Sequence, residues 1–350
     1  MKSFKAVYVL VAGVLLASLT GFSQLAFAAA PQPIELKFGT GTTGNDALGI
    51  FDKNWMKQLE KNTNGRVKMT WLGDGVIGPT ARTYDLMVAG TYDIGETGTG
   101  NMPGNLHDVI SLPFIAPKIL PASMAAYGIY EAEKAIQDEY KDVKVLFFGC
   151  RVASHIFTTK KPIRTVDDFK GLKIEVINAP MADMVKALGG VPMRLANSEV
   201  YSALERGILD GAMFHWNLAY AYKTGEICKY VTLLDITRSS GVQFMNLNKW
   251  NSLPPDIQKA IMDISGYKGA AAMANHFTDS EGDLIKQVTA SARGNLEIIN
   301  LSQAERDKMT KILTPQWDKW AKDREADGKP GKRVLETFLK LQDKYAKESK

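Results

Sequence analysis

The fold is indicated by one stretch of the sequence, Thr165-Val166-Asp167-Asp168-Phe169-Lys170-Gly171-Leu172-Lys173-Ile174. Thr165 is a suitable helix N-cap, and the two aspartates that follow suit the positive start of a short helix, which Gly171 ends. Residues 172–176 then have the apolar pattern of a strand, and residues 179–188 have that of another helix. This succession of helix, strand and helix predicts an α/β protein.

The same alternation extends over most of the chain. Strands are predicted at residues 34–38, 67–72, 92–95 and 143–148, and helices at residues 50–63, 83–89 and 198–206. Such alternation predicts parallel sheets with helices packed on both faces. After residue 240 the pattern becomes helical, with a long helix at about 255–292 and further helices after Ser302 and Pro330. Because no flexible linker separates these parts, we expect two α/β lobes joined by crossing segments, with a ligand cleft between them.

The composition is that of an ordinary globular protein of 350 residues. Hydrophobic residues make up 45% and charged residues 23%, which excludes a largely disordered chain and a polytopic membrane protein. The formal net charge of +5 is not concentrated in a Lys/Arg cluster, so nucleic-acid binding is not expected.

Cys150 and Cys228 form either a disulfide or two separately buried thiols, and their neighbours favour the thiols.

The first 28 residues have the parts of a cleavable secretory signal. Lys2 and Lys5 precede an apolar run from Ala6 to Leu19, and Ala26-Phe27-Ala28 supplies a small-residue exit. The apolar run would rise about 21 Å as a helix, less than the ~30 Å hydrocarbon core, so a membrane anchor is the weaker interpretation. We expect cleavage after Ala28 and localisation in the periplasm, without stable membrane insertion of the mature protein.

No motif in the sequence assembles a reaction. Gly39-x-Gly41-x-x-Gly44 matches a dinucleotide fingerprint, but the acid expected at the end of the second strand would be Asp74, which lies 35 residues after Gly39 where about 20 are expected. The four histidines lack the spacing of zinc ligands, and no G-x-S-x-G nucleophile elbow is present. We therefore expect a hydrogen-bonding ligand loop, no cofactor, no metal and no enzyme activity. The rival class is an exported hydrolase that uses Asp or His in the same cleft.

With this layout, segment 165–174 resembles the periplasmic solute-binding subunits of TRAP (tripartite ATP-independent periplasmic) transporters, the dicarboxylate-binding-protein-like (DctP-like) family. Further matching stretches are Lys161-Pro162-Ile163, Asn178-Ala179-Pro180, Leu188-Gly189-Gly190-Val191-Pro192, residues 198–204, residues 207–211 and Leu112-Pro113-Phe114. The resemblance covers essentially the whole chain after the expected signal.

The resemblance implies a two-lobed periplasmic-binding-protein-like fold with hinge strands and a long helix that spans both lobes. Lobe I would comprise residues 29–151 and about 241–275, and lobe II residues 152–240 and about 276–350 with the C-terminal helices. Proteins of this kind capture a small organic solute by lobe closure and deliver it to membrane permease subunits. The predicted helix at 255–292 is similar to the helix that spans both lobes.

The sequence departs from the family pattern where most members bind organic acids. The arginine that usually follows the G-L-K-[IL] strand, and that forks onto the ligand carboxylate, is replaced by Glu175. A second arginine is common about seven residues before Pro162, where this chain has His155, and Arg151 lies four residues out of register. After Gly211 the chain has Ala212-Met213-Phe214-His215-Trp216-Asn217 in place of a polar Q-E-N-type stretch or a metal-holding E-W pair.

A glutamate at position 175 would repel an organic acid and attract an ammonium group. Glu96 is a second acid expected at the cleft, and Phe214 and Trp216 would wall a cation with their aromatic faces. We therefore expect a small cationic amine, similar to ethanolamine or choline, as the ligand.

Two alternatives stay open, in which Glu175 pairs with Arg151 or Lys173. The ligand is then a neutral polyol, or an organic acid held by Arg151. The other candidate residues would bond hydroxyl groups of the ligand or close the rim of the cleft, and they are His155, Asn178, Thr42, Asn45 and Trp71.

Overall fold

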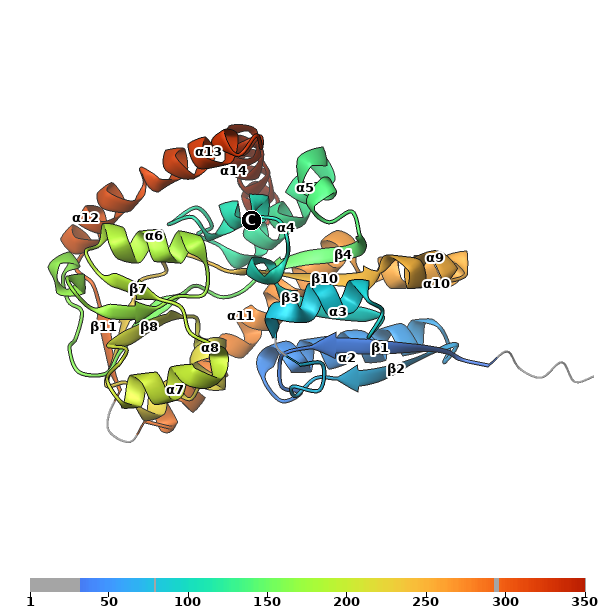
Figure 1. Cartoon of the computed structure of the whole chain (residues 1–350), viewed down its shortest axis with the longest axis horizontal. Coiled ribbons are helices and arrows are strands. Elements are labelled where there is room, and N and C mark those ends of the chain that lie inside the picture. The colour runs from blue at the N-terminus through green and yellow to red at the C-terminus, as the bar shows by residue number, and fades with distance from the viewer. Residues whose placement is uncertain (1–31, 79, 293–295, 350) are drawn as a thin grey trace, which may run out of the picture. The chain divides into compact units, whose positions relative to one another are not determined.

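The computed structural model describes residues 32–78, 80–292 and 296–349. Its strands form two sheets, and helices cover both of them (Figure 1). The expected signal sequence and its cleavage site lie outside the described residues.

The first sheet has the strand order β2-β1-β3-β10-β4. Its strands are β1 (Ile34–Thr40), β2 (Val67–Leu72), β3 (Ile94–Gly98), β4 (Val143–Cys150) and β10 (Ser240–Asn246). β1 pairs in parallel with β2 and β3, whereas β10 runs antiparallel to both of its neighbours. The predicted parallel sheet is therefore mixed, because a strand from late in the chain enters it between β3 and β4.

The second sheet has the order β11-β9-β5-β8-β6-β7. Its strands are β5 (His155–Thr158), β6 (Lys173–Glu175), β7 (Val191–Met193), β8 (Gly211–Phe214), β9 (Tyr230–Leu233) and β11 (Glu297–Asn300). β6 pairs in parallel with β7 and β8, and β5 runs antiparallel to β8 and β9. Each sheet belongs to one lobe, so the expected two-lobed α/β fold is confirmed.

Two segments cross between the lobes side by side. The first joins β4 to β5 and the second joins β9 to β10. They are tied by backbone hydrogen bonds from Arg151 N–H to Ser239 O at 2.9 Å and from Ser154 N–H to Thr237 O at 2.8 Å. These paired segments are the predicted hinge strands.

Helices form the outer layers of both lobes. The α-helices are α2 (Ala47–Asn62), α3 (Thr83–Val88), α4 (Ile119–Ala132), α5 (Lys134–Glu139), α6 (Ala179–Ala187), α7 (Asn197–Glu205), α8 (Trp216–Ala221), α9 (Leu247–Ser252), α10 (Pro255–Asp263), α11 (Gly266–Ala290), α12 (Gln303–Leu313), α13 (Gln316–Ala326) and α14 (Gly331–Glu348). Short 3₁₀ helices are η1 (Thr80–Arg82), η2 (Thr99–Asn101), η3 (Leu106–Ser111), η4 (Val166–Phe169) and η5 (Thr224–Glu226).

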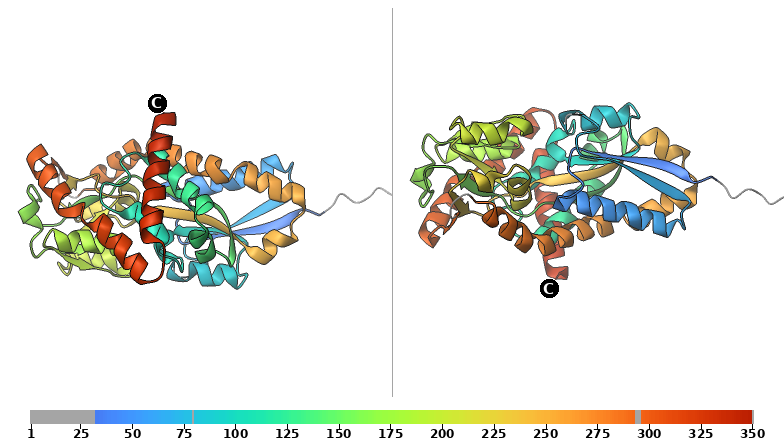
Figure 2. Two further views of the ribbon diagram at one scale, coloured as in Figure 1. Left: turned by 90° about the horizontal axis from the view of Figure 1, so that it is seen from above. Right: turned by 90° about the horizontal axis from the view of Figure 1, so that it is seen from below.

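The long helix predicted at 255–292 is divided into α10 and α11. Gly266 has a φ of 58°, a left-handed conformation that glycine adopts without strain, and it separates the two axes. α11 has 25 residues and is therefore about 37 Å long. It contacts α4 and β4 of the first lobe and α8 and η5 of the second, so it spans both lobes (Figures 1 and 2).

The C-terminal helices contact elements of both lobes. α12 packs against α6 and η4, α13 leads into α14, and α14 packs along α4 where the lobes meet (Figure 2). The division of the chain at residues 151, 240 and 275 stays a prediction.

Cys150 and Cys228 are both free and buried, which confirms the interpretation as separate thiols. Burial raises the pKa of the Cys150 thiol to about 11 and that of Cys228 to about 12. In the part of the chain described above, no helix combines the length and apolarity needed to cross a bilayer.

Candidate functional site

A cleft of about 310 Å³ lies at the C-terminal ends of β1, β3, β4 and β8. Residues of both lobes line it. The first lobe contributes Thr40, Gly41, Thr42, Thr43, Asp46, Leu48, Glu96, Thr97, Gly98 and Arg151, and the second contributes His215, Asn217, Leu218, Ala221 and Tyr222. Its position agrees with the rule that ligands of open α/β sheets bind at strand C-terminal ends. Its volume suits a small organic molecule.

A buried ion pair forms the floor of the cleft. Arg151 Nη2 donates to Glu96 Oε1, and the two side chains are only 7% and 2% exposed. The guanidinium also lies 5.1 Å above the Phe277 ring, and its Nη1 lies 3.1 Å from Met273 Sδ. Because both residues belong to α11, this helix holds the guanidinium in position. Arg151 is the only lysine or arginine among the described residues that line the cleft.

Carboxyl groups outnumber this cation. Asp46 lines the cleft beside Glu96, and Asp52 lies buried behind them on α2 with no hydrogen-bond partner for either oxygen among the described residues. Burial, reinforced by nearby Glu96, raises the pKa of Asp52 well above its usual value, so this carboxyl keeps its proton to a higher pH than an exposed aspartate. Burial also raises the pKa of Glu96, and Arg151 opposes that rise.

The loop after β1 carries hydroxyl groups into the cleft. Asp46 is the N-cap of α2, and its Oδ1 accepts from Gly49 N–H at 2.8 Å. Its Oδ2 accepts from the Thr42 hydroxyl and from the Thr43 N–H at 3.3 Å. One aspartate therefore caps the helix and orders the loop that faces the cleft.

The second lobe faces the cleft with the start of α8. His215 is the N-cap of this helix and its Nδ1 accepts from Leu218 N–H at 3.2 Å. Burial and the positive Arg151 lower the pKa of His215 to about 3, so the imidazole is neutral at neutral pH. Asn217 Oδ1 accepts from Ala47 N–H at 3.2 Å, which links α8 of the second lobe to the start of α2 in the first.

Three of the ten predicted site residues line the cleft: Glu96, Arg151 and Thr42. Glu175 does not line it. Its side chain is buried at the end of β6, where Oε1 accepts from Leu195 N–H at 3.3 Å and Oε2 has no partner among the described residues. Burial raises the pKa of Glu175 to about 7. The described ion pairs join Arg151 to Glu96, and none of them joins Glu175 to Arg151 or Lys173.

The perturbed Glu175 predicts a pH-dependent stability difference. An acid whose pKa rises on folding binds more protons in the folded than in the unfolded state, so its penalty appears as pH rises from about 4.5 to about 7. Glu175→Gln keeps the acceptor for Leu195 and removes the titration. We expect the variant to gain Tm over the wild type at pH 8 and to gain little at pH 4.5, as measured by circular dichroism. The exposed Glu205→Gln is the control, and an equal gain at both pH values would contradict the assignment.

Phe214 and Trp216 do not form a wall of the cleft, and that expectation is corrected. Both are buried inside the second lobe, where Trp216 packs against His155 and Phe157 and Phe214 packs edge-on against Tyr222. The physical reason is the end of β8: the side chains of Phe214 and Trp216 turn into the lobe interior. His215 and Asn217 of the same stretch face the cleft instead.

The remaining predicted residues lie outside the cleft lining. His155 is buried, and its Nδ1 accepts from Leu234 N–H at 3.3 Å. Asn178 caps α6 through Met181 N–H and donates to Ser111 Oγ at 3.2 Å. Asn45 is exposed on the loop, and Trp71 supports that loop from the outside. The side chains of His155 and Asn178 therefore hold backbone segments in place.

Besides Thr40 and Thr97, four polar side chains at the cleft were missed by the sequence reasoning: Asp46, His215, Asn217 and Tyr222. Asp46 could have been found, because an aspartate between a glycine-rich loop and an apolar helical repeat is an N-cap signal. No comparable signal marks the other three, since their orientation depends on where β8 ends.

A glycine permits the close approach of the ion pair to the sheet. A Cβ on Gly241 of β10 would lie 2.3 Å from Glu96 Oε1 and 2.5 Å from Arg151 Nη2. Gly241→Ala is therefore expected to displace the pair and to destabilise the protein by about 1–3 kcal/mol, measured by urea unfolding. Gly282→Ala on α11 is the matched control, because a Cβ there meets nothing within 4 Å and alanine favours the helix. Equal stability of the two variants would contradict this packing.

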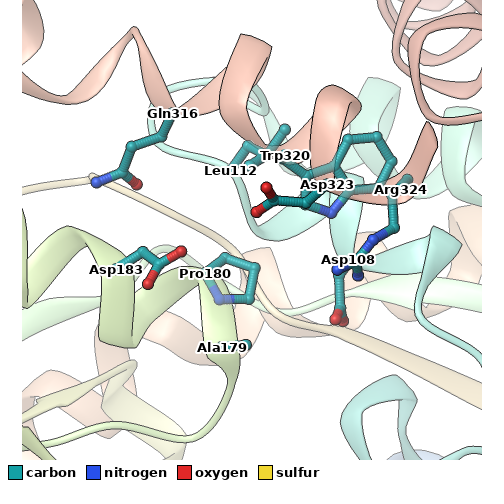
Figure 3. A pocket seen from close by; sticks show the side chains of 9 residues that line it. All are labelled: Asp108, Leu112, Ala179, Pro180, Asp183, Gln316, Trp320, Asp323 and Arg324. Atoms are coloured by element: carbon teal, nitrogen blue, oxygen red, sulfur yellow. The ribbon is translucent and has the colours of Figure 1, made fainter. Parts of the chain in front are cut away.

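A smaller cavity of about 50 Å³ lies among η3, α6 and α13 (Figure 3). Asp108, Asp183 and Asp323 line it together with Trp320 and Arg324. Burial raises the pKa of Asp108 to about 6, and Trp320 Nε1 has no hydrogen-bond partner among the described residues. Its volume admits one or two water molecules, so it is too small for an organic solute.

Comparisons with known proteins agree with this architecture. The family described as bacterial extracellular solute-binding protein, family 7, matches residues 38–323. The 2,3-diketo-L-gulonate-binding periplasmic protein of Escherichia coli K12 is 26% identical over 250 residues, which cover 71% of this chain and 75% of that protein. The C4-dicarboxylate-binding periplasmic protein of Rhodobacter capsulatus is 26% identical over 321 residues, covering 88% and 93%.

A solved structure is similar over almost the whole fold. A TRAP solute-binding protein from Rhodoferax ferrireducens, in complex with copurified benzoate, matches with a TM-score of 0.85 and 24% identity. The match covers 91% of this chain and 100% of that chain.

Proposed function

Because the chain belongs to family 7 of the bacterial extracellular solute-binding proteins, we propose that it binds a small organic solute between its lobes and delivers it to the permease of a TRAP transporter. The chain is a receptor of the transport type and not an enzyme. Members of this kind act in the periplasm, and the signal peptide that would direct the chain there stays a prediction.

The observation that carries the proposal is a cleft lined by both lobes. A buried ion pair lies on its floor in the first lobe, and the start of α8 faces it from the second. A solute that contacts both surfaces stabilises the closed arrangement, because it binds that arrangement better than an open one. We assign solute contacts to Thr42, Asp46, Glu96, Arg151, His215, Asn217 and Tyr222.

For the ligand we propose a small cationic amine, similar to ethanolamine or choline. The charge of the cleft supports this proposal. Glu96 already forms an ion pair with Arg151, and Asp46 adds a further carboxylate at the cleft surface. An ammonium group would offset this excess, and the Tyr222 ring supplies one aromatic face for it. Neither family arginine position carries an arginine in this chain, since they hold Glu175 and His155.

An organic acid is the second candidate. The guanidinium of Arg151 has five N–H groups, and its pairing with Glu96 leaves others for a ligand carboxylate. The names of similar proteins point the same way, because they include a diketogulonate, C4-dicarboxylates and benzoate as ligands. A neutral polyol, bound by the threonines of the cleft, is the third outcome of the test.

A thermal-shift screen distinguishes these candidates. The protein without residues 1–28 is tested against ethanolamine, choline, succinate, benzoate and glycerol. A ligand at 100 times its Kd should stabilise the fold by about 2.7 kcal/mol. Shifts with the acids and none with the amines would overturn the amine proposal. Release of a chemically changed product, seen by NMR, would contradict the receptor function.

A further inference from the structure

The loop that carries Thr42 and Thr43 into the cleft is rich in glycine. Gly41 and Gly44 give its backbone wide conformational freedom, and fixing such a loop costs conformational entropy. A cleft that had to order this loop on binding would lose affinity. Asp46 holds the cleft side of the loop, as described above, so the question is what holds its outer side.

Asp74 binds the outer side of the loop at two points. Its Oδ1 accepts from Gly44 N–H at 3.1 Å, and its own N–H donates to Thr42 O at 3.0 Å. The residue has a φ of 58°, a left-handed conformation that aspartate tolerates better than most residues. That conformation forms part of the turn after β2, from which both bonds reach the loop.

Trp71 anchors Asp74 to the core of the first lobe. Trp71 Nε1–H donates to Asp74 Oδ2 at 3.1 Å, and the indole stacks on the fully buried Phe38 with centroids 5.8 Å apart and planes at 14°. The Lys53 ammonium lies 5.1 Å above the same indole. A Cβ on Gly44 would lie 2.0 Å from Lys53 Nζ, so the loop packs closely on this group.

We propose that Asp74 and Trp71, which lie outside the cleft, are positioning residues that set solute affinity by fixing the loop of Thr42 and Thr43. The inference rests on the proposed function, because it assumes that this cleft binds the solute. It gives Trp71 a function different from that of a rim residue: the indole contacts the loop support and not the solute. The carboxylate of Asp74 is the essential group, since it joins the loop to the indole.

The variants distinguish the effect of the Asp74 carboxylate from the effect of its backbone conformation. Asp74→Gly keeps the left-handed turn and removes both acceptors, whereas Asp74→Asn keeps one acceptor for Gly44. Trp71→Phe keeps the stacking on Phe38 and removes the Nε1–H donor. Asn64→Gly is the matched control, because Asn64 is another exposed residue of the first lobe with a left-handed φ, of 50°, and lies in the turn after α2, outside the cleft and the hinge.

Two measurements test the proposal: amide hydrogen exchange of Thr43 and Gly44 in the ligand-free protein, and titration calorimetry with ethanolamine and, in parallel, succinate. We expect Asp74→Gly to speed exchange at the loop and to weaken binding about tenfold. Asp74→Asn should recover much of both effects, and Trp71→Phe should weaken binding by a smaller factor. Asn64→Gly should change neither measurement.

Faster loop exchange with unchanged affinity would overturn the proposal, and so would unchanged exchange in Asp74→Gly. Failure of the proposed function looks different, because the wild type would then bind none of the five solutes of the thermal-shift screen. In that case the affinity claim falls with it, whereas the exchange data still decide whether Asp74 fixes the loop.

Discussion

Replacement of Arg151 by methionine is expected to lower the free energy of unfolding by about 3–5 kcal/mol. The guanidinium is buried against Glu96, and no other lysine or arginine is found among the described residues of the cleft lining. Methionine keeps most of the side-chain length and removes the charge. Glu96 and the buried Asp52 would then share the interior with no positive group beside them. Urea unfolding, followed by tryptophan fluorescence, should show a lower midpoint with an unchanged m-value.

The matched control is Arg66→Met. Arg66 forms an ion pair with Asp256 in which both side chains are about half exposed, at 49% and 56%, so its loss should hardly change the urea midpoint. The double variant Glu96→Gln/Arg151→Met should recover part of the lost stability, because it no longer buries an unpaired carboxylate. If Arg151→Met were no less stable than Arg66→Met, the buried pair would not have the energetic importance assigned to it.

The sequence predicted the elements well where a periodic pattern is bounded by a cap or a glycine. The segment 165–174 forms η4 with a capping box at Thr165 and Asp168, followed by β6. The direction of the strands was predicted less well. Local patterns do not show that β10 inserts antiparallel between β3 and β4, because that pairing depends on a chain segment that crosses from the other lobe and returns.

Part of the cleft was also accessible from the sequence. Glu96 was predicted at the cleft from its place at a strand end, and Arg151 as a possible substitute for the missing family arginine, but their pairing was not predicted. The two residues are far apart in the chain and meet only because β10 brings β3 and β4 into one sheet, with Gly241 leaving space for both side chains. A sequence pattern predicts which residues lie at strand ends. It does not predict the order of the strands in the sheet, on which the ion pair depends.

The error at residues 214–217 has a simple geometric cause. Phe214 and Trp216 were chosen for their aromatic rings, whereas His215 and Asn217 line the cleft. β8 ends at Phe214, His215 is the N-cap of α8, and α8 begins at Trp216, so the directions of these side chains depend on where the strand gives way to the helix. No glycine or proline marks that point in the sequence.

Glu96→Gln is expected to change the charge preference of the cleft with a smaller loss of stability than Arg151→Met, because Asp52 still lies near the guanidinium. Glutamine has nearly the same shape and can still accept a hydrogen bond from Arg151, so the guanidinium stays in place but is no longer neutralised. Removing one buried carboxylate should weaken ethanolamine binding by roughly 10- to 100-fold. The same change should strengthen succinate or benzoate binding, because Arg151 becomes available to a ligand carboxylate.

Titration calorimetry with ethanolamine and succinate measures both affinities in the wild type and the variant. Glu133→Gln is the matched control, since Glu133 is also buried and paired with an arginine, Arg333, but does not line the cleft. The ratio of the two affinities should change in Glu96→Gln and stay constant in Glu133→Gln. If the wild type binds succinate and not ethanolamine, a gain in succinate affinity on Glu96→Gln still supports the function of Glu96, because the glutamate then competes with the ligand for Arg151. A ratio that is equal in all three proteins would show that Glu96 does not determine which charge the cleft accepts.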